Sequence, residues 1–399
     1  MISNGQRQVV ILGGARTPIG KFQGQLSGLP ATELGAVAIR GAISRTGIDP
    51  AAVDEVLMGM VLQAGAGQAP ARQASIKAGV PATVSATTIN KVCGSGMKAA
   101  MLGSQAIRSG DADLIIAGGM ENMFQAPYSL PGARAGFRLL DKAAVDLAVH
   151  DGLWCAFENW HMGSAAEWVA TACDIPRERQ DEFSVQSHKK ALAAMRRGAF
   201  KNEIEPVEIK GRKGAVIIVD ADESPRADTS MEVLSGLRPI FAKDGTVTAG
   251  NAPGLNMGGA ALVLAGADWA ETHGHAPKAR ILGYAQAGVD PKEIFLAPVK
   301  GVTQLLKQTG LKMEDFDLVE MNEAFAAQIL ADGDQIPGWD WDKVNVNGGA
   351  IALGHPIGAT GARLIVTLMN ALEERGGKRG LATACLGGGE AVALAIEMA

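Results

Sequence analysis

The hydrophobic pattern at the start of the chain predicts alternating strands and helices. Residues 9–12 are a short β-branched and apolar run, which is typical of a buried strand. Residues 42–49 have the pattern of an amphipathic helix that ends at a Thr-Gly pair. Residues 53–58 then form a second apolar run of strand length. This alternation predicts an α/β protein.

The same pattern returns in the last third of the chain. Residues 305–312 again form an amphipathic run with a Thr-Gly stop, and residues 316–321 form the apolar run that follows. The distance from Thr46 to Thr309 equals the distance from Met58 to Met321. We therefore predict two similar halves.

Cys93 and His355 occupy equivalent places in these halves. Each precedes a helix-like run, and each run leads to a glycine-bounded apolar strand, at residues 113–118 and 381–386. Two such α/β units related by a pseudo-twofold axis would bring Cys93 and His355 together at their junction.

The middle of the chain departs from the repeat. It has Gly- and Pro-rich turns and two helical patterns, at residues 163–172 and 177–197. We interpret it as an insertion that covers one face of the sheets. The predicted division is residues 1–121 and 246–270 for the N-terminal half, 122–245 for the inserted loop domain, and 271–399 for the C-terminal half.

The composition is that of a globular protein of two or three packed units. The chain has 399 residues, of which 47% are hydrophobic and 20% are charged. Its net charge of −5 argues against a nucleic-acid-binding surface, although a local basic patch for a small anionic ligand stays open. Four scattered cysteines without a CxxC pair argue against a disulfide scaffold or a zinc site.

The sequence predicts neither a secretory signal nor a membrane span. The strand-like run at residues 9–12 starts too early to leave room for a cleaved presequence. The long uncharged stretch at residues 246–267 is broken by Asn251, Pro253 and Asn256. We therefore expect a soluble cytoplasmic protein.

Cys93 is a candidate nucleophile. It begins the run Cys-Gly-Ser-Gly-Met-Lys, in which glycines permit a sharp turn before a helix. A helix N-terminus stabilises a thiolate, and its free N–H groups bind an oxyanion. The alternative is a small buried cysteine at a tight turn.

Three other stretches carry candidate chemistry. His355 precedes a proline, which restricts its backbone, and a histidine beside a thiol acts as its general base. Cys385 ends a strand before three glycines, whose N–H groups suit a ligand, unless they form only a hairpin. Asn322 follows a buried strand and is placed either to orient a water or to form a turn.

Together these stretches resemble the motifs of the thiolase family, which comprises acetyl-CoA acetyltransferases and 3-ketoacyl-CoA thiolases. The motifs are Cys-Gly-Ser-Gly, Asn-Glu-Ala-Phe, Gly-His-Pro-Ile-Gly and Cys-x-Gly-Gly-Gly, in the family's order. The resemblance covers the whole chain. It implies two βαβαβαββ halves in a five-layer α/β/α/β/α arrangement with an inserted loop domain.

The resemblance also implies the reaction, a reversible Claisen condensation of two acetyl-CoA molecules to acetoacetyl-CoA and CoA. Cys93 would carry the acyl group, and His355 would deprotonate it. Asn322 would position a water, and Cys385 would remove the α-proton of the second acetyl-CoA. Gly387 would complete an oxyanion site with Cys93. CoA and its thioesters are then substrates, and no metal or other cofactor is expected.

The family pattern further points to a set of CoA-binding residues and to a homotetramer, a dimer of dimers. The tetramer contacts are expected in residues 122–140, with Met123, Tyr128 and Leu130. His161 is alternatively a buried structural histidine. The other histidines, His150, His188, His273 and His275, are expected to be solvated or to cap helices. The CoA-binding set is Leu153, His161, Met162, Arg226, Phe241, Ala249, Ala324 and Phe325.

Several positions depart from the family pattern and leave the acyl chain length open. Pro253 replaces a common serine, residues 294–296 replace a Met-Gly stretch of the acyl pocket, and Glu390 replaces a common glutamine. The alternatives are a degradative thiolase of broad chain length and a non-catalytic acyl-CoA or lipid carrier. A decarboxylative condensing enzyme is disfavoured because that class typically pairs one cysteine with two histidines.

Overall fold

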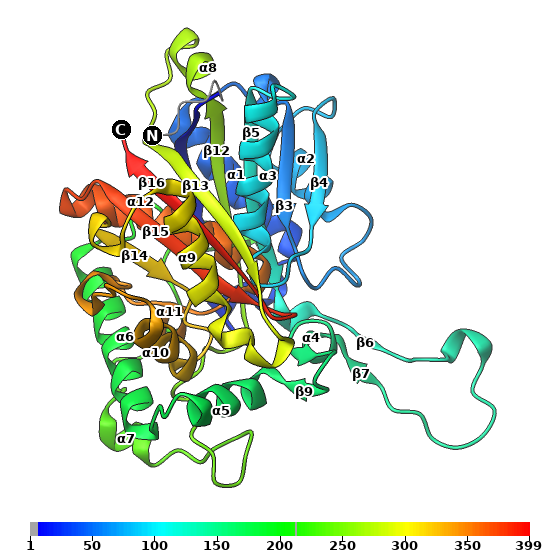
Figure 1. The fold of residues 1–399 in the computed structure, drawn as a ribbon. Helices are drawn as coiled ribbons and strands as arrows, with labels where there is room; N and C mark the ends of the chain where they lie inside the picture. The colour runs from blue at the N-terminus through cyan, green and yellow to red at the C-terminus, as the bar shows by residue number, and fades with distance from the viewer. Residues whose placement is uncertain (1–6, 212–213) are drawn as a thin grey trace.

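The central feature of the computed structural model is one mixed sheet of ten strands (Figure 1). The structure describes residues 7–211 and 214–399. The strands are β1 (Val9–Arg16), β2 (Gly20–Lys21), β3 (Glu55–Gly59), β4 (Ser85–Ile89), β5 (Leu114–Asn122), β12 (Asn256–Gly266), β13 (Ala279–Gly288), β14 (Leu318–Met321), β15 (Arg379–Leu386) and β16 (Glu390–Met398). Their order is β14-β15-β16-β13-β1-β12-β5-β3-β4, with β2 paired to β12.

Strands β1 and β13 join two similar halves of this sheet. Their pairing is short, with Val10 opposite Arg280 and Ile11 opposite Ala279. In one half β3 runs parallel to β5, and in the other β14 runs parallel to β15. Antiparallel strands lead from each parallel pair to the junction. The predicted internal repeat is therefore confirmed at the level of topology.

The helix ends confirm the repeat in detail. Helix α1 (Ala31–Thr46) ends at Gly47, and α9 (Ala297–Thr309) ends at Gly310. Both glycines are left-handed, with φ of 66° and 71°, a conformation that glycine adopts without strain. β3 and β14 are the buried strands that follow.

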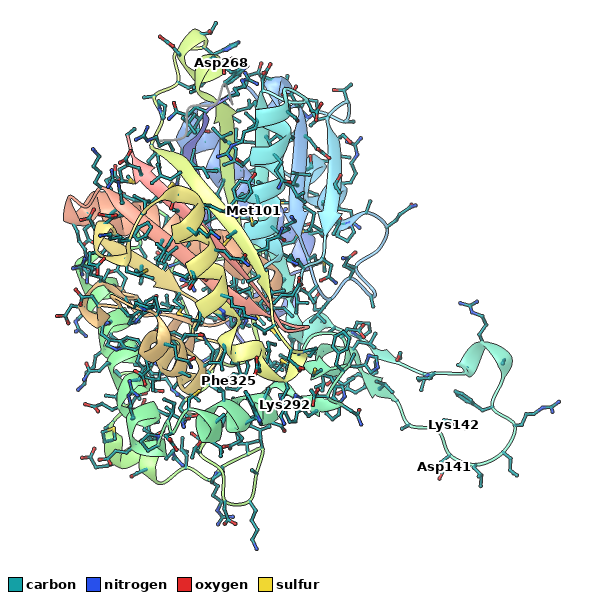
Figure 2. All side chains as sticks on the ribbon, viewed as in Figure 1. Met101, Asp141, Lys142, Asp268, Lys292 and Phe325 are labelled. Carbon is teal, nitrogen blue, oxygen red and sulfur yellow. The ribbon has the colours of Figure 1, made fainter. Side chains whose placement is uncertain are left out.

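Two buried helices, α3 (Ser95–Ser109) and α12 (Ile357–Arg375), form the middle layer. They pack on each other and on strands of both halves. A Cβ on Gly96 would lie 2.7 Å from the backbone nitrogen of Ala362, so glycine permits their close approach. Helices α1 and α2 (Pro70–Lys77) cover the outer face of the N-terminal half of the sheet, and α9 covers the outer face of the C-terminal half. The predicted α/β/α/β/α class is confirmed, and Met101 of α3 lies near the centre of the molecule (Figure 2).

The segment between β5 and β12 packs beyond one end of the sheet (Figure 1). Its two predicted helices are confirmed as α5 (Met162–Ala172) and α6 (Arg177–Arg197). Both contact α10 (Ala326–Gln335), and α6 also contacts α11 (Ala350–Leu353).

No helix in the described part of the chain has the length and apolar character to cross a membrane. Other elements between β5 and β13 are α4 (Leu147–His150), α7 (Met231–Ser235), α8 (Ala267–Thr272), β8 (Trp154–Cys155), β9 (Trp160–His161), β10 (Val207–Lys210) and β11 (Val216–Val219).

A long hairpin projects from this segment, away from the body of the molecule (Figures 1 and 2). Strands β6 (Tyr128–Ser129) and β7 (Val145–Asp146) form its base. Tyr128 and Leu130 are exposed, as tetramer contacts require. Met123 is not, because its side chain is only 2% exposed within its own chain. The expectation that Met123 forms tetramer contacts is therefore wrong.

Candidate active site

Both halves and the inserted segment contribute to one mainly apolar cavity of about 380 Å³. Cys93 lies just before α3, His355 just before α12, and Cys385 at the end of β15. All three line this cavity. The repeat predicted that Cys93 and His355 meet at the junction, and the structure places them there.

The turn that carries Cys93 is strained. Val92 has a φ of 45°, which is unusual for a β-branched residue. Side chains on both sides hold it, because the Val92 N–H donates to Asn90 Oδ1 at 3.0 Å and Ser95 Oγ donates to the Val92 carbonyl at 2.6 Å. Such strain at a candidate nucleophile indicates a side chain that is held in one position.

The thiol of Cys93 is less acidic than the sequence predicted. Burial raises its pKa to about 12, although hydrogen bonds from the backbone N–H groups of Gly387 and Cys93 lower it. Helix α3 begins two residues later, at Ser95. The expectation of a stabilised thiolate is therefore wrong for the free protein, in which desolvation outweighs the N–H groups.

His355 is held in a defined orientation. Asn256 Oδ1 accepts its backbone N–H at 2.8 Å, and its Nδ1 lies 2.7 Å from Thr360 Oγ1. The Thr360 hydroxyl donates its own proton to the Pro356 carbonyl at 3.0 Å, so it accepts one from Nδ1. The Nε2 atom then carries the lone pair. Burial, with a smaller effect of Arg363, lowers the pKa of His355 to about 3, so the imidazole is neutral.

Asn322 lies beside His355. Its Nδ2 is 3.4 Å from His355 Nε2, and its backbone N–H donates to the Thr383 carbonyl at 3.0 Å. Its Oδ1 is buried and accepts no hydrogen bond from the described residues. Asn322 therefore presents one free acceptor next to the imidazole.

The glycine run after Cys385 is a hairpin turn between β15 and β16. Gly388 and Gly389 have φ of 91° and 80°, so they serve the turn itself. Gly387 lines the cavity and donates its N–H to Cys93. Both interpretations of the run therefore apply. Burial raises the pKa of Cys385 well above its usual value, and the neighbouring Cys93 raises it further.

Seven of the eight predicted CoA-binding residues line the cavity. The ring of His161 stacks on Phe241 with centroids 4.8 Å apart, and its Nδ1 accepts the Gly163 N–H at 2.9 Å. His161 thus lies in the cavity wall and also caps α5. The seven are Leu153, His161, Met162, Phe241, Ala249, Ala324 and Phe325.

Arg226 is the exception, because it does not line the cavity. Its backbone N–H donates to Nδ1 of His188 at 3.1 Å. His188 is buried, so the expectation that it is solvated or caps a helix is wrong. Burial and the nearby Arg226 lower the pKa of His188 to about 4. His150 and His273 are exposed, as expected.

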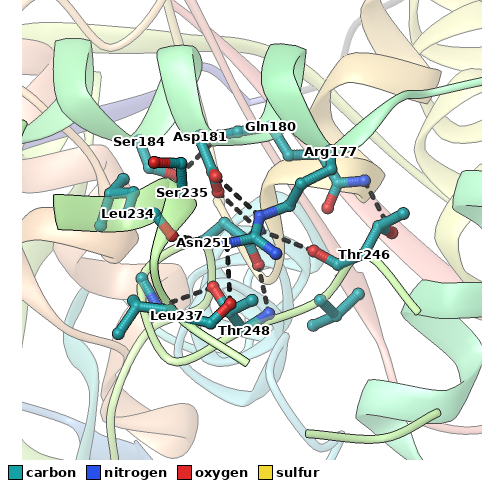
Figure 3. A network of polar contacts seen from close by, with 12 residues as sticks. Arg177, Gln180, Asp181, Ser184, Leu234, Ser235, Leu237, Thr246, Thr248 and Asn251 are labelled. Carbon is teal, nitrogen blue, oxygen red and sulfur yellow. Dashed lines mark hydrogen bonds and ion pairs between the residues drawn. The ribbon is translucent and has the colours of Figure 1, made fainter. Parts of the chain in front are cut away.

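A polar network joins α6 to the segment that contains Thr246, Thr248 and Asn251 (Figure 3). Asp181 accepts Arg177 Nε at 2.6 Å and Asn251 Nδ2 at 3.0 Å. Asn251 Oδ1 in turn accepts the backbone N–H of Thr248 at 2.8 Å. Because Thr248 and Ala249 line the cavity, the network fixes this wall to α6.

Comparison with known proteins identifies the family of this chain. The family model described as "Thiolase, N-terminal domain" matches residues 9–268, and "Thiolase, C-terminal domain" matches residues 275–398. The chain belongs to the thiolase family. The predicted family membership is thereby confirmed.

Similar thiolases are known from several bacteria. The chain is 53% identical over 390 residues to an acetyl-CoA acetyltransferase of Pseudomonas aeruginosa, covering 98% of this chain and 99% of the relative. It is 54% identical over 389 residues to that of Cupriavidus necator, with the same coverage. The crystal structure of the Bacillus anthracis acetyl-CoA acetyltransferase superposes with a TM-score of 0.97 at 43% identity, covering 100% of both chains.

The departures from the thiolase pattern fall on the site. Pro253, Ile294 and Phe295 all line the cavity. Glu390 forms an ion pair with Lys91 at 2.8 Å, which links the turn before Cys93 to the hairpin after Cys385. The glutamate at this position thus has a structural partner in this thiolase.

Sequence reasoning missed two polar residues of this thiolase site. Asn256 holds the backbone of His355, and Glu121 accepts backbone N–H groups from both halves of the molecule. Both side chains are almost fully buried. The sequence feature that could have revealed such residues is a polar residue within a glycine-rich apolar strand, as in Gly-Gly-Met-Glu-Asn. A buried polar side chain requires partners.

Proposed function

We propose that this acyltransferase of the thiolase family is an acetyl-CoA C-acetyltransferase. It would condense two acetyl-CoA molecules to acetoacetyl-CoA and CoA, and catalyse the reverse thiolysis. The observation that carries this proposal is the presence of two thiols, Cys93 and Cys385, and of the neutral imidazole of His355 on a single cavity. Relatives that match nearly the full chain are named acetyl-CoA acetyltransferases.

The first half-reaction transfers an acetyl group to Cys93. His355 Nε2 accepts the thiol proton as the sulfur attacks the thioester carbon, because neither thiol nor imidazole is charged beforehand. CoA leaves as its thiol once that proton is returned. Asn322 Oδ1, a buried acceptor, suits a water that helps to bind the developing oxyanion.

The second half-reaction forms the carbon–carbon bond. Cys385 gives its proton to the neutral His355 and, as thiolate, removes the α-proton of the second acetyl-CoA. The resulting enolate attacks the acetyl carbon on Cys93, and the bond between that carbon and the Cys93 sulfur breaks. The proton held by His355 then passes to that sulfur, so both thiols and the imidazole are neutral again. The backbone N–H groups of Cys93 and Gly387, which already point at the Cys93 sulfur, are suited to the second oxyanion.

The apolar wall supports a CoA thioester as the ligand and a short acyl group. Phe241 stacked on His161 and the neighbouring Met162 suit the pantetheine chain. Phe295 is buried against Phe325, with ring centroids 5.4 Å apart. A buried ring at this position leaves less room than the glycine of the common Met-Gly stretch. We therefore favour acetoacetyl-CoA over longer substrates.

Thiolysis of 3-ketoacyl-CoA substrates of increasing chain length tests the proposal. We expect turnover that is fastest with acetoacetyl-CoA and falls as the acyl chain lengthens. Similar rates with long chains would instead favour a degradative thiolase of broad range. Binding without turnover would favour a carrier.

Two cysteine variants test the division of roles. Cys93→Ala should form no acetyl-enzyme. Cys385→Ala should still exchange acetyl groups at Cys93 but should not condense, because it lacks the base for the α-proton. Equal loss of both half-reactions in Cys385→Ala would contradict its assigned role. Mass spectrometry of the acetyl-enzyme distinguishes the two outcomes.

The inserted segment, residues 122–245, is proposed as the CoA-binding cover of two thiolase halves, residues 1–121 with 246–270 and residues 271–399. It supplies Leu153, His161 and Met162 to the cavity. Arg226 lies close to His188 rather than on the cavity lining, which argues against a direct contact with the reacting end of the ligand.

We also propose a homotetramer that acts in the cytoplasm. The edge strand β4 and the projecting hairpin offer two separate self-association surfaces, as a dimer of dimers requires. All four cysteines are free thiols, which suits a reducing compartment.

A further inference from the structure

A buried carboxylate lies where the two halves of the molecule meet. Glu121, near the end of β5, is fully buried and accepts three backbone N–H groups. Oε2 accepts those of Val61 at 3.0 Å and Gly358 at 2.9 Å, and Oε1 accepts that of Leu62 at 3.2 Å. None of these contacts belongs to a regular sheet or helix ladder.

The partners of Glu121 come from both halves. Val61 and Leu62 follow β3 in the N-terminal half, and Leu62 belongs to a cluster against which Cys93 packs. Gly358 is the second residue of α12, three positions after His355. One carboxylate therefore connects the Cys93 side of the site with the turn that carries His355.

The packing around this contact leaves no room for adjustment. A Cβ on Gly358 would lie 2.7 Å from Glu121 Oε2. A Cβ on Gly119 of β5 would lie 2.0 Å from the Gly358 carbonyl oxygen. Side chains at these glycines would force β5 and α12 apart. The close approach of the two backbones is thus matched to the length of the glutamate side chain.

We propose that Glu121 is a positioning residue that fixes the His355 turn against the half of the molecule that carries Cys93. This inference rests on the function proposed above. The carboxylate lies at the N-terminus of α12, where the helix dipole favours negative charge.

Glu121 has a second, electrostatic effect that distinguishes it from a purely structural residue. Its charge raises the pKa of Cys93, although burial of the thiol is the larger cause. Burial raises the pKa of Glu121 itself to about 7, and its three N–H partners oppose that rise. The other titratable groups that line the cavity with Cys93 are His161, His355 and Cys385. Burial lowers the pKa of both histidines and raises that of Cys385, so all three are uncharged in the free protein.

Two substitutions separate position from charge. Glu121→Gln keeps the shape, but it removes the charge and turns an amide N–H₂ towards at least one backbone N–H. Glu121→Asp keeps the charge but is one methylene shorter, so it cannot reach both halves. Glu397→Gln is the control, because Glu397 is also buried but lies away from the site. It is near the C-terminal end of β16, far from the hairpin that follows Cys385, and it pairs with Arg280 and Arg379.

Two measurements are needed, one for the effect of position and one for the effect of charge. One is kcat and KM for acetoacetyl-CoA thiolysis. The other is the rate at which iodoacetamide alkylates Cys93 between about pH 7 and about pH 10, which follows the thiolate fraction. Mass spectrometry assigns the label to Cys93, with Cys93→Ala as the blank. The alkylation readout does not depend on any enzymatic turnover.

We expect kcat to fall at least about tenfold in both Glu121 variants, towards the roughly 100-fold loss that a 1 Å misplacement causes, with little change in KM. Alkylation of Cys93 should be faster in Glu121→Gln at each pH and unchanged in Glu121→Asp. A variant with a more reactive thiol and lower turnover is the signature of a positioning residue.

Several results would overturn the proposal. They are wild-type kcat in both Glu121 variants, an equal loss of kcat in Glu397→Gln, or lower activity in Glu121→Gln without faster alkylation. If Glu121→Gln does not fold, wild-type kcat in Glu121→Asp overturns it. If the wild-type protein itself does not turn over acetoacetyl-CoA, the proposed function fails, whereas the alkylation comparison still reports the electrostatic effect of Glu121 on Cys93.

Discussion

At the scale of single residues, the free site holds its reactive groups uncharged. Burial raises the pKa of Cys93 to about 12 and lowers that of His355 to about 3, so a standing thiolate–imidazolium pair is unfavourable. In the mechanism that we propose, proton transfer from Cys93 to His355 therefore accompanies attack on the substrate. The thiol is thereby protected from side reactions until a thioester is bound.

Thr360 sets the tautomer on which that transfer depends. Thr360→Val removes the hydroxyl that accepts the His355 Nδ1 proton and preserves the shape of the side chain. We expect kcat to fall roughly three- to tenfold, the value of one hydrogen bond, because Nε2 then carries the proton more often. Steady-state thiolysis measures the effect.

Thr360→Ser is the matched variant for this test, since it keeps the hydroxyl. It should restore most of the activity. Unchanged kcat in Thr360→Val would show that the tautomer is held by other contacts, such as that between Asn322 Nδ2 and His355 Nε2.

The candidate catalytic residues could be predicted from the sequence because their motifs are local. The charge state of Cys93 was predicted wrongly, because a thiolate was expected. A pattern such as Cys-Gly-Ser-Gly indicates a turn before a helix, and the structure contains that turn. The pKa of Cys93 instead depends on how deeply distant segments bury it. Glu121 and Asn256 were missed for the same reason, because their partners are far away in the sequence.

At the scale of elements, the shape of the cavity depends on the hydrogen bonds by which α6 holds the segment after α7, which contains Thr248 and Asn251. Asp181→Asn removes the negative charge that faces Arg177. It also places an amide N–H₂ opposite either Arg177 Nε or Asn251 Nδ2, both of which are hydrogen-bond donors. We expect a loss of about 1–3 kcal/mol in the free energy of unfolding and a higher KM for acyl-CoA. Urea denaturation and steady-state kinetics measure the two effects.

The control for the Asp181 prediction lies on the same helix. Arg179 pairs with Asp334 at the surface, where both side chains are more than a third exposed. Arg179→Met should change the unfolding free energy by less than about 1 kcal/mol and leave KM unchanged. A larger effect of Arg179→Met than of Asp181→Asn would contradict the role given to the buried network.

Elements with strong local signals were predicted well. Residues 177–197 match α6 at both ends, because Pro176 precedes the helix and Gly198 ends it. The pairing of β1 with β13, which joins the halves, was not predicted, since nothing in either strand's own sequence specifies its neighbour.

At the scale of the whole molecule, the projecting hairpin is the feature that a monomer does not explain. Leu139 and Leu140 are 80% and 83% exposed, so apolar surface stands in water unless another copy covers it. Replacing both leucines by serine should lower the mass measured by light scattering from that of a tetramer to that of a dimer. Activity should persist, because neither leucine lines the cavity.

Lys142→Ser, on the same hairpin, is the comparison for the leucine variant and should leave the mass unchanged. A wild-type mass of a monomer, or an unchanged mass in the double leucine variant, would contradict hairpin-mediated assembly. In the second case the edge strand β4 is the next surface to test.

The middle layer, which consists of α3 and α12, determines which parts of the protein unfold last. Helices α3 and α12 are covered on both sides by sheet, so their amide hydrogens should be among the last to exchange with solvent. Cys93 and His355 lie immediately before these two helices. Partial opening at the surface would therefore leave the reactive pair assembled, and heat inactivation should coincide with cooperative melting of the whole chain.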